Sequence, residues 1–120
     1  MSNKTKNEEM NEIILWVVCL KYNTPVEDVK TSTGKLYPDL RQCFAWIASN
    51  IEGATNAEIA NALNCDQNAI SGLIAIATRK IRSGERMAAI VDEYHEDVKE
   101  AKEMLKDYLR IKAAKRIRKF

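Results

Sequence analysis

The chain has 120 residues, of which 46% are apolar and 30% are charged, so it suits one domain with a buried core. Its net charge of +2 is too small to identify a partner by bulk charge alone. The longest apolar run, Ile13 to Leu20, follows three glutamates and is far shorter than the roughly 20 residues that span a bilayer. We therefore expect no signal peptide, no membrane contact and a cytoplasmic location, in a bacterium or in the host of a phage.

The first half of the chain carries three predicted helices. Residues 1–8 are polar and are expected to be disordered. Each helix that follows shows the three- and four-residue apolar spacing of one buried face or begins at a typical capping or proline residue. We expect these helices over residues 9–22, 26–30 and 38–49.

The second half carries three more predicted helices. Thr55, with Glu58 three residues later, predicts a capped helix start, and Asp66 predicts another. Asn64 lies between them and is the type of non-glycine residue best able to adopt a positive φ in a tight turn. We expect helices over residues 56–63, 66–81 and 86–115. No strand-like alternation and no repeat is found, so we predict an all-α fold of about five to six helices with a long C-terminal helix.

Residues 55–81 fit the pattern of a helix-turn-helix. Two helices that cross closely over a short turn need a small residue in the first helix, which Ala60 supplies. Apolar residues at the positions that would pack the two helices together are Ile59, Leu63, Ile70 and Leu73. An ordinary helical hairpin with the same core pattern is the alternative.

The second helix of such a motif would offer its first turn to the major groove. Gln67 and Asn68 lie there, and their amides can each pair with the N6/N7 edge of adenine, while Ser71 can reach a base or a phosphate. Simple surface polarity is the alternative for both amides. Basic side chains at the far end of the helix would contact the DNA backbone, namely Arg79, Lys80 and Arg82.

The order of these elements resembles the C-terminal DNA-binding domain of the bacterial replication initiator DnaA, over about Ile14 to Ile81. The similar segments are Val18 to Val29, at that domain's opening; Arg41-Gln42, at its Pro-Arg-Gln segment; Thr55 to Leu63, at its Leu-Pro-Glu-Ile-Gly helix; Asp66 and Ile70, at its Asp-His-Thr-Thr-Val; and Arg79-Lys80-Ile81, at its Arg-Lys-Ile close. Residues 9–84 would then form the helix-turn-helix domain, and residues 85–120 a long helix with a basic tail.

The resemblance implies double-stranded DNA binding through the second motif helix, with backbone contacts from Arg41 and from the preceding loop, where Lys35 is basic. The family's His-Thr base-reading pair is Gln67-Asn68 here, so its usual recognition sequence is not assumed. Nothing resembles a phosphate-binding Gly-x-x-x-x-Gly-Lys-[Ser/Thr] loop, so no ATPase module is expected. We predict a stand-alone, sequence-specific regulator of transcription or replication, of the kind that a phage or mobile element carries.

The last predicted helix is strongly asymmetric in charge. From Glu85 to Asp107 there are eight acidic and four basic residues, whereas residues 110–120 hold six basic residues and no acidic one. The basic end can attract phosphate or serve as a solubilising tail. The helix itself can fold back on its own core or form a homodimer, and both alternatives stay open.

Cysteine and histidine usage argues against catalysis and metal binding. Cys19, Cys43 and Cys65 are odd in number and far apart, so we expect reduced and mostly buried thiols. His95 is the single histidine, and no Cys-x-x-Cys accompanies it. We therefore expect no enzyme, no cofactor, no metal and no small-molecule substrate.

A protein-interaction module is the rival interpretation. Residues 66–76 contain no basic side chain, which favours a scaffold that binds a replication or transcription factor rather than DNA. The basic residues that follow favour DNA.

Overall fold

The computed structural model describes the backbone of residues 6–31 and 36–118, and these ranges contain helices and no strand. In chain order the helices are α1 (Lys6–Lys21), α2 (Val26–Thr31), α3 (Pro38–Asn50), α4 (Asn56–Leu63), the short 3₁₀ helix η1 (Gln67–Ala69), α5 (Ile70–Arg82) and α6 (Arg86–Arg118). The predicted all-α class is confirmed. Residues 6–8 were expected to be disordered but form the start of α1, where Glu8 and Glu9 suit the positive end of the helix dipole.

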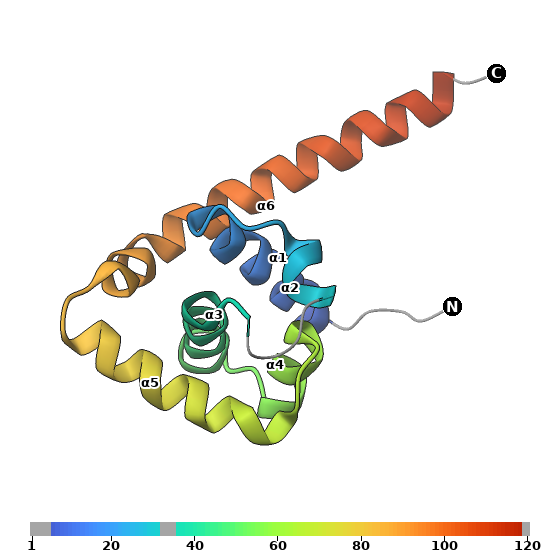
Figure 1. Ribbon diagram of the computed structural model, residues 1–120. Helices are drawn as coiled ribbons and strands as arrows, with labels where there is room; N and C mark the ends of the chain where they lie inside the picture. The colour runs from blue at the N-terminus through green and yellow to red at the C-terminus, as the bar shows by residue number, and fades with distance from the viewer. Residues whose placement is uncertain (1–5, 32–35, 119–120) are drawn as a thin grey trace.

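Helix α3 lies at the centre, with α1, α4, α5 and α6 packed around it (Figure 1). Its apolar residues are buried on most of its circumference, as a central helix requires. Leu40, Cys43, Phe44, Ile47 and Ala48 are all covered. The burial of this one helix therefore fixes the positions of the four helices around it.

The start of α4 and the turn after it follow the sequence expectation. Thr55 Oγ1 accepts a hydrogen bond from the Glu58 backbone N–H at 3.2 Å, and the Thr55 N–H donates to Glu58 Oε1 at 2.9 Å, which completes a capping box. Helix α4 ends at Leu63, and Asn64 after it has the expected positive φ of 54°. Asn64 Nδ2 also donates to the Lys30 carbonyl at 2.8 Å, so the turn is tied to α2.

The next helix differs from expectation in its first turn. Asp66 Oδ1 accepts from the Asn68 N–H at 2.9 Å, which confirms Asp66 as the cap. The Ala69 N–H then donates to the Asp66 carbonyl three residues back, so Gln67–Ala69 is a 3₁₀ turn, and the α-helix begins only at Ile70.

The first half of α6 folds back on the core. Its buried residues recur at three- and four-residue spacing and contact α1, α3 and α5. They are Met87, Ile90, Tyr94, Val98 and Ala101. The self-packing alternative is thus confirmed for this half, while the rest of α6 projects beyond the body of the molecule (Figure 1).

The backbone conformation of Asn64 gives a stability prediction. Alanine pays about 1 kcal/mol or more in the left-handed region, whereas glycine adopts it freely. Both variants lose the hydrogen bond to Lys30, so their comparison isolates the backbone term. We expect Asn64→Ala to unfold in less urea than Asn64→Gly, and equal stability of the two would contradict the left-handed turn.

Candidate nucleic-acid interface

Helix α5 buries one side and leaves the opposite side open. Ile70 and Ala77 are buried, and Leu73, Ile74 and Ile81 pack partly against the core. The exposed residues recur at three- and four-residue spacing, as one helix face requires. We call them the α5 face, which begins in η1: Gln67, Asn68, Ser71, Gly72, Ala75, Arg79 and Arg82.

The α5 face begins with polar side chains. Gln67 and Asn68 are both exposed, so the two predicted amides point to solvent rather than into the body. Ser71 is exposed too, and its Oγ accepts a hydrogen bond from Asn56 Nδ2 at 3.2 Å. Asn56, at the start of α4, therefore lies beside the face. Asn56 could not be predicted from the sequence, because only the approach of α4 and α5 brings it there.

The middle of the α5 face is nearly free of side chains. Gly72 and Ala75 are exposed, and a Cβ added at Gly72 would meet no other atom within 4 Å. A second molecule can therefore approach the helix backbone closely at this point.

The far end of the α5 face is positively charged. Arg79 and Arg82 are exposed, and no acidic residue occurs between Gln67 and Gly84. Lys80 differs from expectation, since its ammonium group forms an ion pair with Asp39 and donates to Gln42 Oε1 at 2.8 Å. Lys80 thus joins α5 to α3 and does not belong to the exposed arginine pair.

Arg41, which was expected on the DNA backbone, is wrongly assigned. It is fully buried, with 0% of its surface exposed. Its Nε donates to the Leu36 carbonyl at 2.6 Å, Nη1 to the Leu63 carbonyl at 2.9 Å, and Nη2 to the Val29 carbonyl at 2.9 Å. Carbonyls near helix C-termini lack intrahelical partners, and the guanidinium supplies donors to two of them. It therefore cannot reach a phosphate. Lys35, the other expected backbone contact, lies outside the described residues.

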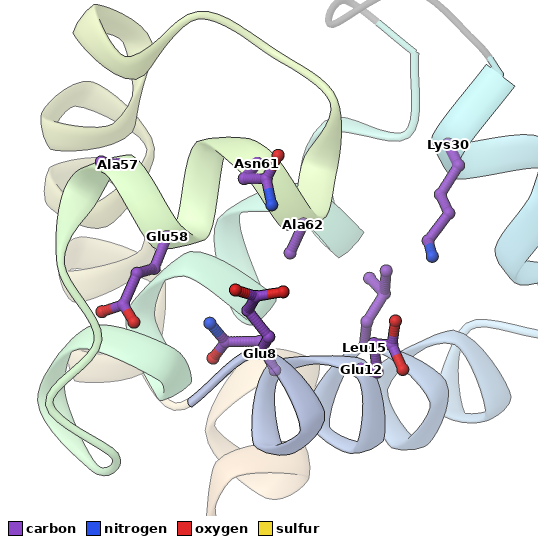
Figure 2. A pocket seen from close by; sticks show the side chains of 9 residues that line it. Glu8, Glu12, Leu15, Lys30, Ala57, Glu58, Asn61 and Ala62 are labelled. Atoms are coloured by element: carbon purple, nitrogen blue, oxygen red, sulfur yellow. The ribbon is translucent and has the colours of Figure 1, made fainter. Parts of the chain in front are cut away.

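A separate open hollow of about 340 Å³ lies between α1 and α4 (Figure 2). Glu8 and Glu12 reach it from α1, Glu58 from α4 and Lys30 from α2. Three carboxylates against one ammonium make this surface negative, so it would repel phosphate. It is distinct from the α5 face in both charge and lining.

Two of the three thiols, those of Cys19 and Cys43, are buried, and Cys65 is half-buried. Burial raises the pKa of Cys19 to about 11 and that of Cys43 to about 12, so both thiols stay protonated at neutral pH. His95 is exposed and stacks edge-on against Tyr94 with ring centroids 5.6 Å apart.

Among the residues described, no three His, Cys, Asp or Glu side chains gather as metal ligands would. Within the same part of the chain, no helix has the length and hydropathy to cross a membrane.

Comparison with known proteins identifies no relative. No protein-family model matches the chain, and no curated protein or solved structure matches it. The resemblance to the initiator domain therefore rests on the short sequence motifs alone.

The buried position of Arg41 predicts a structural role. Arg41→Met would leave three carbonyls without these donors, at about 1 kcal/mol or more each. We expect the free energy of unfolding to fall by about 3 kcal/mol or more, measured in urea.

Arg79→Met is the matched control, because Arg79 is exposed and its loss should change stability by less than about 0.5 kcal/mol. A small stability loss for Arg41→Met together with weaker duplex binding would return Arg41 to the DNA-contacting residues.

Proposed function

We propose that the chain binds double-stranded DNA by placing the α5 face in the major groove, with α4 and α5 acting as a helix-turn-helix. The observation that carries the proposal is the composition of that face. It runs from exposed amides through Gly72 and Ala75 to Arg79 and Arg82 without one acidic side chain. Each part suits a different part of the duplex.

The dimensions of the helix agree with this placement. The 13 residues of α5 span about 20 Å at 1.5 Å per residue, and the major groove is about 12 Å wide and 8.5 Å deep. Gln67 and Asn68, in the 3₁₀ turn just before α5, would face base edges, where an amide can pair two-fold with adenine. Small side chains in the middle let the helix sit deep. Arg79 and Arg82, near the other end, would reach phosphates.

The cellular role follows from the sequence resemblance. A sequence-specific regulator of transcription or replication is the role it suggests, and Gln67-Asn68 implies a target different from that of the initiator domain. Asn56 is added to the expected contacts, because its hydrogen bond to Ser71 Oγ puts it at the edge of the α5 face.

A protein-interaction module is the second candidate. Two basic residues that were expected to contact DNA interact within the molecule instead, because Arg41 is buried and Lys80 is paired with Asp39. This favours the second candidate. The exposed backbone at Gly72 would also accept a partner helix. This candidate predicts no affinity for duplex DNA.

Salt dependence separates the two candidates. Counterion release makes the logarithm of a DNA-binding constant fall with the logarithm of salt concentration, by about 0.9 per phosphate contacted. We expect the double variant Arg79→Ala/Arg82→Ala to make this slope less steep on a random duplex, by the amount that corresponds to about two phosphate contacts.

The control for charge alone is Lys99→Ala/Lys102→Ala, because these exposed lysines lie on α6. It removes the same net charge and should leave the slope nearly unchanged. Absence of duplex binding by the unaltered chain at low salt would reject DNA binding and favour the interaction module.

Base reading is tested separately, on the best site selected from a random duplex pool. We expect Gln67→Ala to weaken binding to that site by about 1–3 kcal/mol, while binding to non-specific duplex stays unchanged. Equal losses on both duplexes would show that Gln67 does not read a base.

A further inference from the structure

An apolar groove lies between α1 and α6, at the base of the projecting part of α6. Three large apolar side chains are prominently exposed among the described residues, and two of them, Leu20 (59%) and Met104 (58%), line this groove. Trp16, Val17 and Ala101 complete its apolar lining, and its volume is about 270 Å³. Apolar surface gathered in one hollow is typical of a contact site rather than of scattered surface residues.

The edge of the groove on α6 is acidic. Asp97 and Glu100 line it, and Glu93 and Glu96 lie on the preceding turn. Lys21 neutralises part of this negative charge, because its Nζ lies 2.5 Å from a carboxylate oxygen of Glu93 and 2.9 Å from one of Asp97. Glu96 and Glu100 are both exposed, so the groove favours an occupant that combines apolar and basic side chains.

The C-terminal part of α6 has that composition. From Arg110 to Arg118 the sequence holds five basic residues, no acidic one, and Ile111 and Ile117 among them. Helix α6 is continuous to Arg118 and leads away from the body (Figure 1). Residues 102–118 extend about 25 Å beyond Ala101, the last buried residue among those whose side chains are described. As part of one continuous helix, this end cannot turn back into the groove of its own chain.

We propose that a second copy of this chain occupies the groove, with the two α6 helices antiparallel and each basic end lying over the other copy's α1–α6 groove. Such a two-fold contact is self-complementary and closed. With the two-fold axis at the level of residue 106, positions 112 and 116 of one copy come level with positions 100 and 96 of the other. A parallel pair would instead align acidic with acidic and basic with basic segments, which is unfavourable. The dimer goes beyond the proposed DNA binding and does not depend on it.

Sedimentation velocity of the full chain over a range of concentrations tests the proposal. We expect a monomer–dimer equilibrium for the unaltered chain. Leu20→Asp and Met104→Asp should each raise the dimer dissociation constant by about tenfold or more, because each buries a charge in place of an apolar side chain. Leu36→Asp is the matched control, since Leu36 is also exposed (51%) but lies outside the groove. It should leave the equilibrium unchanged.

Charge exchange tests the antiparallel register. We expect Glu96→Lys/Glu100→Lys to dissociate the dimer, and the addition of Lys112→Glu/Arg116→Glu to restore it. Circular dichroism of each variant serves as the control that its helix content is unchanged. A chain that stays monomeric at every concentration, or a dimer indifferent to Leu20→Asp and Met104→Asp, would overturn the proposal. Failure of the fourfold variant to recover the dimer would overturn the register.

Discussion

The buried guanidinium of Arg41 is the interaction on which the arrangement of the smaller helices depends. Its hydrogen bonds reach the carbonyls of Val29 in α2, Leu36 before α3 and Leu63 at the end of α4. Removing a charged group from water is costly, and a buried guanidinium is tolerated only where its N–H donors are hydrogen-bonded. These three backbone segments therefore have to meet at one point, and the end of α4 is fixed by that meeting.

The position of α4 determines how α5 is presented. Leu63 is followed directly by Asn64, whose left-handed conformation turns the chain and whose amide is tied to Lys30. Asp66 then caps the next turn. Packing of α5 against α3 buries Ile70 and Ala77 and leaves the α5 face in solvent. The surface proposed to enter DNA is thus a consequence of a turn held by α2 and α3.

Basic residues divide into two groups with different tasks. Arg41 and Lys80 connect backbone segments and helices inside the molecule, through carbonyls in one case and Asp39 in the other. Arg79 and Arg82 remain exposed. Because Lys80 lies between them in sequence, a count of positive charge along the chain overstates what the surface offers to phosphate.

Local chemistry explains which features could be predicted from the sequence. The capping box at Thr55, the positive φ of Asn64 and the helix periodicities depend on near neighbours, so residue type and spacing were sufficient. The burial of Arg41 depends on carbonyls 5, 12 and 22 residues away, which no periodicity encodes. One signal was available, since Ala45 and Ala48 continue the same side of α3 and are buried with it. The ion pair of Lys80 joins residues 41 positions apart, and no pattern in the sequence indicates it.

Titration of the isotope-labelled chain with a short duplex, followed by backbone amide NMR shifts, tests the proposed binding surface most directly. The shifts are expected to concentrate at residues 67–82 and at Asn56, and to leave the first half of α6 unmoved. Shifts confined to α6, to the hollow between α1 and α4, or absent at low salt would contradict DNA binding through the α5 face.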